Sequence, residues 1–321
     1  MPGQDLVSLA DIQAAAARID AQICRTPLLR TELGRPDAPL FVKAECLQIG
    51  GAFKLRGALN AVAMLTSDER ARGVVTHSSG NHAQALARAA GAAGIRATIV
   101  MPTLSSDVKR LATQAQGATV VLVDIADRAS AVEKIQATTG AVFVPPYDDP
   151  AVVAGQGTIG LEILDDLPEV STVLVPVSGG GLVSGIAVAI KSRLPRARIV
   201  GVEPELAGDL AEGFARGERV SWDTALTGRT IADGLRTPSV GELNWAHITT
   251  LVDDVVTVTE DEIRSAMRAV VLGAHLVCEP SGAVAVAGFH AHPEVVGPGP
   301  AVAVVSGGNV SPALLRDVLA D

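Results

Sequence analysis

The sequence predicts an α/β protein built on parallel sheets, and three observations support this fold class. Short apolar runs that are typical of strands alternate with helical patterns along the whole chain. Glycine-rich turns join several of these runs directly to the helix that follows. The length of 321 residues is enough for about two domains, each with its own core.

The expected elements follow in chain order. We expect strands at 39–43, 73–75, 97–100, 119–123, 142–144, 172–177, 198–202 and 301–305. Helical patterns cover 55–65, an alanine-rich segment that ends near Ala93, 183–193 and 312–319. The units between residues 70 and 149 repeat as a compact block that ends near Tyr147.

Composition and charge exclude several classes of protein. The chain is 48% hydrophobic but only 2% aromatic, so its cores must consist of aliphatic side chains. A net charge of −9 argues against binding to nucleic acid or to an anionic membrane surface, and no apolar run approaches the roughly 18 residues of a membrane span. The first five residues lack a signal peptide's basic and apolar regions. Cys24, Cys46 and Cys278 are odd in number and widely spaced, which favours free thiols in a reducing cytoplasm.

Lys54 is the most informative candidate residue. It lies at the junction between the expected strand 39–43, a glycine-rich turn and the helix 55–65, and it is flanked by Phe53 and Leu55. Apolar surroundings lower the pKa of an amine, and a neutral amine can attack a carbonyl group to form a Schiff base. A surface lysine at a helix start is the alternative interpretation.

A second polar loop, Thr76-His77-Ser78-Ser79-Gly80-Asn81-His82, opens the alanine-rich helix. Ser and Asn are common N-caps, so an ordinary cap is one interpretation. The start of a helix also presents free backbone N–H groups, which suit a carboxylate or a phosphate.

The loop Ser178-Gly179-Gly180-Gly181-Leu182 joins the strand 172–177 to the helix 183–193. Glycine lets the backbone approach an anion closely, and the helix dipole favours negative charge, so this loop is typical of a phosphate site. A dinucleotide fold is the competing interpretation, because Glu203 ends the next strand where a ribose-binding acid would lie. Ser184 stands where that fingerprint has its third glycine, so a monophosphate fits better.

A third loop, Ser306-Gly307-Gly308-Asn309, follows the strand 301–305. A hydroxyl group at the end of a strand could reach a ring nitrogen of a ligand. A plain strand-to-helix turn is the alternative.

Together these loops resemble the pyridoxal-phosphate enzymes of fold type II, specifically the group of serine/threonine ammonia-lyases and serine racemases. The order of the motifs along nearly the whole chain is specific, and they include Lys43-x-Glu45-x-Leu47-Gln48, Phe53-Lys54-x-Arg56-Gly57-Ala58, Ser-Ser-Gly-Asn-His at 78–82, Ala154-Gly155-Gln156-Gly157-Thr158, the glycine loop at 178–182, Glu279-Pro280-Ser281-Gly282-Ala283 and Ser306-Gly307-Gly308-Asn309. Gly50, Ala52 and Ser178 depart from the usual pattern, and Ser178 could narrow or reshape the phosphate site.

The resemblance implies the fold of the tryptophan synthase β subunit, with two parallel-sheet α/β domains. Residues 1–70 and 150–321 would form a large cofactor-binding domain, and 71–149 a small inserted domain. Pyridoxal 5'-phosphate would lie in the cleft between the two domains. The family suggests a homodimer that acts on a small amino acid.

The resemblance also implies roles for individual residues. Lys54 would carry the cofactor covalently and later remove the Cα proton of the substrate. Phe53 would pack beside the cofactor ring, Asn81 would donate to the ring oxygen, and the hydroxyl of Ser306 would meet the pyridine nitrogen. Four backbone N–H groups would bind the phosphate: those of Gly179, Gly180, Gly181 and Leu182. The substrate carboxylate would lie on the loop of Ser78, Ser79, Asn81 and His82, with Arg128 as a helper or merely a solvated charge.

Several activities remain open within this resemblance. The leading hypothesis is an ammonia-lyase that converts L-threonine or L-serine to a 2-oxo acid and ammonia. Ser79, on the cofactor face opposite Lys54, would also allow a serine racemase with side dehydratase activity, since racemisation needs a base on each face. An ammonia-lyase for another 3-hydroxy amino acid, such as 3-hydroxyaspartate, a cysteine-forming β-replacement enzyme and a catalytically silent binding module are further alternatives.

Two candidate metal sites are distinguished by their partners. His290-Ala291-His292 has close spacing for a metal, yet it precedes Pro293 and we expect no carboxylate or thiol partners for it, so we interpret it as a loop. In the resembled group, positions that match Glu203, the Ala207 carbonyl and Asp209 bind a divalent cation. Hard oxygen ligands suit Mg²⁺, Mn²⁺ or Ca²⁺, and the ion would have a structural role beside the glycine loop. A solvated acidic turn is the alternative.

Overall fold

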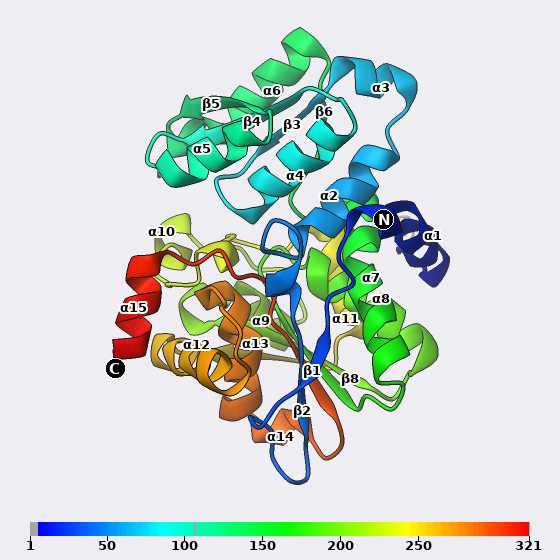
Figure 1. The fold of residues 1–321 in the computed structure, drawn as a ribbon, viewed down its shortest axis with the longest axis vertical. Helices are drawn as coiled ribbons and strands as arrows, with labels where there is room; N and C mark the ends of the chain where they lie inside the picture. Colours follow the sequence, from blue (N-terminus) through cyan, green and yellow to red (C-terminus); the bar gives the residue numbers. More distant parts are fainter. Residues whose placement is uncertain (1–5, 106, 321) are drawn as a thin grey trace.

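The computed structural model describes residues 6–105 and 107–320, which form two sheets with helices on both sides of each (Figure 1). The six-stranded sheet has the order β1 (Leu28–Arg30), β2 (Leu40–Lys43), β10 (Ala301–Val304), β7 (Thr172–Pro176), β8 (Arg198–Pro204), β9 (Asp254–Val258). The four-stranded sheet has the order β5 (Thr119–Val123), β4 (Ala97–Pro102), β3 (Val74–His77), β6 (Val142–Phe143). All strand pairs are parallel except β1 with β2.

The helices alternate with these strands along the chain. They are α1 (Leu9–Ile19), α2 (Lys54–Ala63), α3 (Ser67–Arg72), α4 (Asn81–Ala92), α5 (Asp107–Ala115), α6 (Arg128–Thr139), α7 (Pro150–Asp166), α8 (Gly181–Arg193), α9 (Asp209–Arg216), α10 (Thr224–Thr227), α11 (Glu242–Leu251), α12 (Glu260–Gly273), α13 (Pro280–Ala291), α14 (Pro293–Val296) and α15 (Pro312–Ala320). None of the helices among the described residues is long and apolar enough to cross a membrane.

The predicted strands are all present, with small shifts at their ends. Two further strands, β1 and β9, lie at the two edges of the large sheet and were not among the expected strands. β1 runs antiparallel to β2, so the large sheet is mixed at that edge rather than wholly parallel as expected. A three-residue strand carries too little apolar periodicity to be recognised from its sequence.

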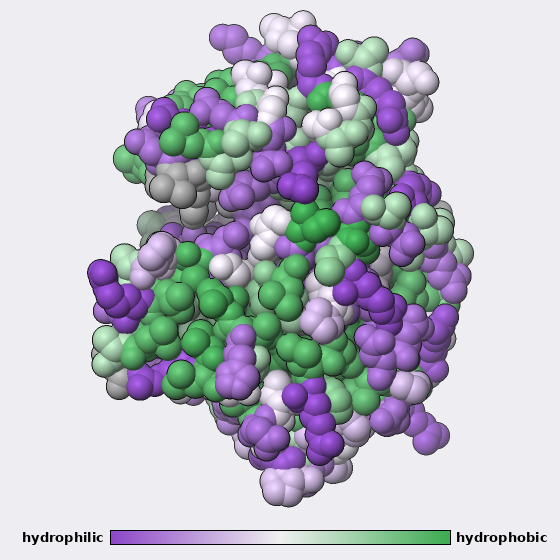
Figure 2. All heavy atoms as spheres, viewed as in Figure 1, coloured by the Kyte–Doolittle hydropathy of each residue, from purple (hydrophilic) through white to green (hydrophobic). Residues whose placement is uncertain are grey.

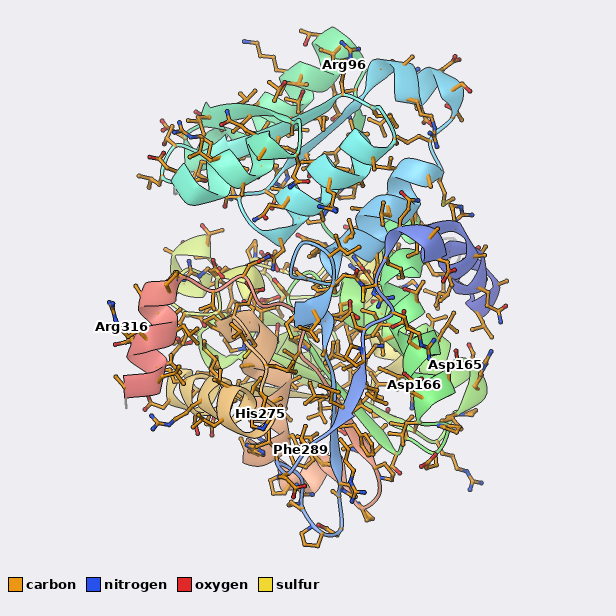
Figure 3. All side chains as sticks on the ribbon, viewed as in Figure 1. Arg96, Asp165, Asp166, His275, Phe289 and Arg316 are labelled. Atoms are coloured by element: carbon orange, nitrogen blue, oxygen red, sulfur yellow. The ribbon has the colours of Figure 1, made fainter. Side chains whose placement is uncertain are left out.

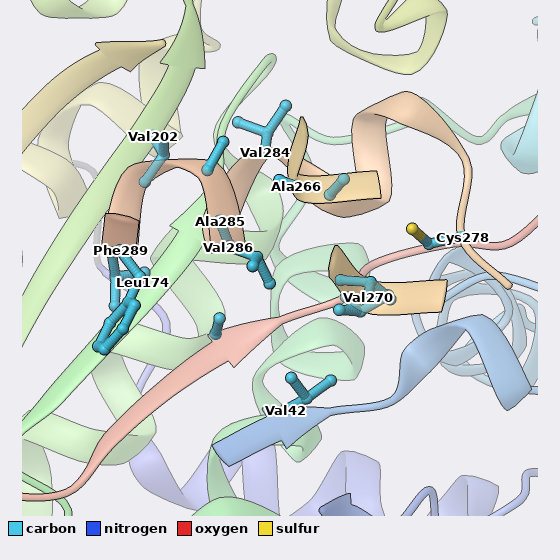
Figure 4. Close-up of a cluster of buried hydrophobic side chains, with 14 of the residues drawn as sticks. Val42, Leu174, Val202, Ala266, Val270, Cys278, Val284, Ala285, Val286 and Phe289 are labelled. Carbon is cyan, nitrogen blue, oxygen red and sulfur yellow. The ribbon is translucent and has the colours of Figure 1, made fainter. Parts of the chain in front are cut away.

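The aliphatic strands of the large sheet bury both faces. In β7, Leu174 packs with α12 and α13, whereas Val173 and Val175 pack with α7 and α8. Successive side chains of a strand point to opposite faces, so a strand that is covered on both sides must be apolar throughout. Figure 4 shows the first of these cores, in which the fully buried Phe289 lies among valine and alanine side chains.

The C-terminal end of α7 carries two acidic residues, Asp165 and Asp166, that lie at the surface (Figure 3). Negative charge is unfavourable at this end of a helix. Arg25 offsets it, with a guanidinium nitrogen 2.6 Å from Asp166 and another 3.6 Å from Asp165.

The segment of His290 and His292 is not the loop that we expected, because α13 continues through Ala291. Proline disfavours helical backbone at the residue before it, so Pro293 ends α13 at Ala291 with His292 as the C-cap. The two imidazoles lie against the backbone carbonyls of Leu33 and Thr257. The expectation that the pair has no carboxylate partner is also wrong, because His292 Nδ1 lies 3.0 Å from Glu294 Oε1. The three cysteines are free, Cys24 at the surface and the other two buried.

Candidate active site

Lys54 is the first residue of α2, directly after the turn that leaves β2 and η2 (Glu45–Leu47). Its Nζ donates a hydrogen bond of 2.6 Å to the carbonyl of Pro146 and lies 5.0 Å from the ring centroid of Phe53. Although the residue keeps some exposed surface, desolvation of the ammonium group lowers its pKa to about 8. The chain therefore presents an amine that loses its proton far more readily than an exposed lysine does.

A buried ionic network anchors the helix that carries Lys54. Arg56 is fully buried, with guanidinium nitrogens 2.8 Å from Glu45 and 2.6 Å from Glu162, and Lys43 Nζ lies 2.5 Å from Glu162. Burial opposes the charge on Arg56, but the two carboxylates raise its pKa above the usual value. The network joins β2, α2 and α7, and so holds the start of α2 against the large sheet.

The loop of Ser306 lies next to the loop of Lys54. Phe53 donates a backbone hydrogen bond of 3.1 Å to Ser306, and Ala52 pairs with Gly307 in an isolated bridge. Ser306 is only 4% exposed, and its Oγ donates to the carbonyl of Ser281 at 3.4 Å. The structure therefore brings together two loops that are about 250 residues apart in sequence.

The polar loop at 78–82 begins α4 without an ordinary cap. The N-cap is Gly80, which has no side chain, and no side-chain cap is present there among the described residues. Ser78 Oγ accepts instead from the Gly80 N–H at 3.2 Å, outside the helix, and both Ser78 and Ser79 are half-buried. The backbone N–H groups at this helix start are thus not satisfied by a capping side chain, as an anion site requires.

Asn81 connects this loop to the large sheet. Its Nδ2 donates to Glu279 Oε1 at 2.7 Å, and its Oδ1 accepts from Asn309 Nδ2 at 2.8 Å. The loops of Lys54, Ser306 and Asn81 therefore meet at one place.

The glycine loop also begins a helix without a side-chain cap. Gly180 adopts φ of +92°, which glycine tolerates best, and α8 begins at Gly181. The loop lies next to Tyr147, since a Cβ on Gly179 would be 2.2 Å from the ring of Tyr147. Tyr147 follows Pro146, whose carbonyl accepts the hydrogen bond from Lys54, so the glycine loop and Lys54 flank the same segment.

Ser178, the departure from the four-glycine pattern, does not leave its hydroxyl unpaired. Its Oγ lies 2.5 Å from Thr237 Oγ1 and accepts from the Thr237 N–H at 3.2 Å. The serine thereby ties the loop before α11 to the glycine loop.

His82 lies behind the polar loop rather than at its surface. Its side chain is 2% exposed, and Nε2 lies 3.0 Å from the carbonyl of Val144. Burial, and next the charge of Lys54, lower its pKa to about 3, so the imidazole is neutral. The predicted contact of His82 with the substrate stays a prediction.

Arg128 is the first residue of α6, and its Nε donates to the Ile125 carbonyl at 3.0 Å. Together with burial, which has the larger effect, its charge lowers the pKa of His77, the residue that precedes Ser78. Its predicted help in substrate binding stays a prediction.

Of the three predicted metal ligands, Glu203 lies near the end of β8, and Ala207 and Asp209 follow that strand. Glu203 is buried, and its carboxylate accepts from the N–H groups of Leu210 and Ala211 at 3.4 and 2.8 Å. Burial and the charge of Asp209 raise the pKa of Glu203, and burial raises that of Asp209 to about 7. Asp209 Oδ2 is buried and has no hydrogen-bond partner among the described residues, and Ala207 ends η4 (Glu205–Ala207) just before it. Within 6–105 and 107–320 no group of three His, Cys, Asp or Glu side chains could hold a metal, so this set would need the carbonyl as well.

Sequence reasoning gave no role to four residues that the structure places at the site. Glu279 and Asn309 contact Asn81, and Pro146 and Tyr147 adjoin Lys54 and the glycine loop. Glu279 and Asn309 lie within motifs that the sequence displays, Glu-Pro-Ser-Gly-Ala and Ser-Gly-Gly-Asn. Their partners could not be named without the fold.

Known proteins resemble this chain over most of its length. A family model described as pyridoxal-phosphate dependent enzyme matches residues 19–307. An L-threonine ammonia-lyase of Thermotoga maritima is 42% identical over 320 residues, which cover 98% of this chain and 78% of the relative. A serine racemase of Arabidopsis thaliana is 42% identical over 321 residues, which cover 96% and 95%.

A solved structure of maize serine racemase matches this chain with a TM-score of 0.90 at 36% identity, covering 98% of both chains. The α/β fold of type II that the motifs implied is thereby confirmed. The chain belongs to the family of pyridoxal-phosphate dependent enzymes.

Proposed function

We propose that this protein is an L-threonine/L-serine ammonia-lyase that uses pyridoxal 5'-phosphate and releases a 2-oxo acid and ammonia. The observation that carries the proposal is Lys54, whose desolvated amine has a pKa near 8 where three polar loops meet. Similarity to the Thermotoga L-threonine ammonia-lyase over nearly the whole chain supports the substrate class.

The residues present fit the cofactor. The start of α8 has no side-chain cap and suits a phosphate on the N–H groups of Gly179, Gly180, Gly181 and Leu182. Lys54 would supply the amine for covalent attachment, and Phe53 would pack beside the ring. Asn81 would donate to the ring oxygen, and Ser306 would offer a neutral hydroxyl to the ring nitrogen. When bound, pyridoxal phosphate supplies an electron sink for the bonds at Cα.

The protein itself would bind the substrate and move the protons. The uncapped start of α4, with Ser78 and Ser79, suits the substrate carboxylate. Lys54 would take the proton from Cα, since its amine is neutral in a large fraction of molecules near pH 8. A base on one face is sufficient for elimination of the β-hydroxyl group.

The experiment that tests this function measures 2-oxo acid release from a panel of L-threonine, L-serine and 3-hydroxyaspartate, with chiral analysis of the remaining substrate. Release of 2-oxo acid from threonine and serine supports the proposal. A preference for 3-hydroxyaspartate would assign that amino acid as the substrate instead. A silent binding module would show neither product nor a visible absorption band from attached cofactor.

Serine racemase activity is the second candidate, because Ser79 lies on the polar loop and the Arabidopsis relative is equally similar. Replacing Ser79 by alanine should remove racemisation and preserve elimination from the L-substrate measurably better, since only racemisation needs a base on the second face. Both rates are measured on the same preparation. Equal loss of the two activities would assign Ser79 to substrate binding instead, and a parent protein without racemisation would favour the plain ammonia-lyase.

We also propose that Glu203, the Ala207 carbonyl and Asp209 hold a divalent cation (Mg²⁺, Mn²⁺ or Ca²⁺). Two buried carboxylates fit such an ion: burial and the charge of Asp209 raise the pKa of Glu203, and Asp209 has an oxygen lacking a partner among the described residues.

A chelator should lower the thermal midpoint and the activity, because an ion that binds only the folded state adds stability by mass action. Magnesium, manganese or calcium should restore both. The metal site is to be abandoned if the chelated protein keeps full stability and turnover and Glu203→Gln changes neither.

We also propose that the protein is a homodimer and is located in the cytoplasm. Apolar side chains gather on the face that carries α12 and α15 (Figure 2), and Leu272 at 60%, Leu47 at 50% and Val277 at 48% are unusually exposed. Exposed apolar patches of this kind mark protein interfaces. The free thiols support a reducing compartment.

A further inference from the structure

The side chain of Asn81 is one member of a chain of hydrogen bonds. Asn309 Nδ2 donates to the carbonyl of Gly50 at 2.9 Å and to Asn81 Oδ1 at 2.8 Å. Asn81 Nδ2 then donates to Glu279 Oε1 at 2.7 Å. The chain thus begins beside the turn of Lys54 and ends at a carboxylate that is 5% exposed.

The backbone carbonyl of Gly50 fixes the direction of every donor. A backbone carbonyl only accepts hydrogen bonds, whereas a primary amide has two N–H groups on nitrogen and an accepting oxygen. Asn309 must therefore turn its nitrogen to Gly50, which places its second N–H on the oxygen of Asn81. Asn81 must then turn its nitrogen to Glu279. Reversing either amide would place oxygen against oxygen.

Two glycines leave room for this chain. A Cβ on Gly51, which has φ of +77°, would lie 2.5 Å from Asn309 Oδ1. A Cβ on Gly307 would lie 2.3 Å from Glu279 Oε1 and 3.3 Å from Asn81 Nδ2. Both glycines belong to the loops that place Lys54 and Ser306, so the backbone of the site is shaped around the same side chains.

We propose that Glu279 and Asn309 are positioning residues that hold the amide of Asn81 in a single orientation toward the cofactor. Glu279 uses one N–H of Asn81, and the second N–H is the one that meets the ring oxygen. The inference rests on the proposed function, in which Asn81 contacts that oxygen. The chain of hydrogen bonds also joins α4, which packs on the small sheet, to loops of the large sheet. It therefore fixes how closely α4 and these loops approach each other at the site.

The variant Glu279→Gln tests the inference because glutamine presents either an oxygen or a nitrogen to Asn81 and no longer fixes its amide. We expect weaker cofactor binding and a changed visible absorption spectrum of the bound cofactor. Misplacement of one contact should lower kcat roughly tenfold, while KM changes by less than about twofold, as expected for loss of an interaction that acts mainly in the transition state. Asn309→Ala, at an exposed residue, should produce a spectral change of the same kind.

Arg88→Ala is the matched control, since Arg88 is exposed on α4 and lies outside the chain. The thermal midpoint of each cofactor-free protein separates positioning from structure, because a merely structural role would lower it and leave the spectrum of bound cofactor unchanged. A parental spectrum and cofactor affinity in both Glu279→Gln and Asn309→Ala would overturn the inference, and Asn309→Ala alone decides if Glu279→Gln does not fold. A parent protein that takes up no cofactor would refute the proposed function instead.

Discussion

Replacing Lys54 by alanine should abolish turnover and the covalent attachment of cofactor. Lys54 Nζ is desolvated to a pKa of about 8 where the polar loops meet, and alanine removes both the attacking amine and the base. Loss of proton transfer alone costs roughly 10²–10⁴-fold in rate, and loss of covalent attachment adds to it. Steady-state 2-oxo acid release and borohydride reduction followed by peptide mapping measure the two effects.

The pH dependence provides a second measurement of the same residue. Because burial lowers the pKa of Lys54 to about 8, its neutral fraction rises steeply with pH around that value and levels off only well above it. The rate of cofactor uptake by the cofactor-free protein should follow that rise. Lys134→Ala, at an exposed position on α6, is the control and should behave like the parent. Reduced cofactor attached to another residue by mapping would show that the assignment of Lys54 is wrong.

The largest effect on stability should come from replacing Arg56 by methionine. Methionine has a similar length but no charge, so it would remove the ion-pair partner of Glu45 and leave Glu162 paired with Lys43. Breaking a buried ionic network by removing one partner costs about 3–5 kcal/mol, because the charges left behind stay desolvated. Urea unfolding of the two proteins measures the difference in free energy of unfolding.

Arg25→Met is the matched control. Arg25 is 52% exposed and pairs with Asp165 and Asp166 at the surface, where an ion pair contributes about 0–1 kcal/mol. A loss in Arg56→Met no greater than in Arg25→Met would contradict the structural importance of the network. Since Arg56 and Lys54 belong to the first turn of α2, we expect the same variant to reduce cofactor binding as well.

Local patterns determined the strand-loop-helix junctions. Apolar runs, glycines and helix starts act within about ten residues, so the positions of Lys54, of the polar loop at 78–82 and of the glycine loop at 178–182 could be predicted from neighbouring residues alone. The order of these motifs along the chain was sufficient to indicate the family and hence the fold.

The tertiary structure alone decided which of these loops touch and what they touch. Nothing in the sequence near Asn81 names Glu279 or Asn309, which lie about 200 residues away, and nothing near Arg56 names Glu162. The antiparallel β1 likewise depends on a partner strand rather than on its own three residues. Hydrogen bonds and ion pairs between distant segments form only when packing of the two sheets and their helices brings those segments together. The residue pattern within one segment therefore does not identify its partner.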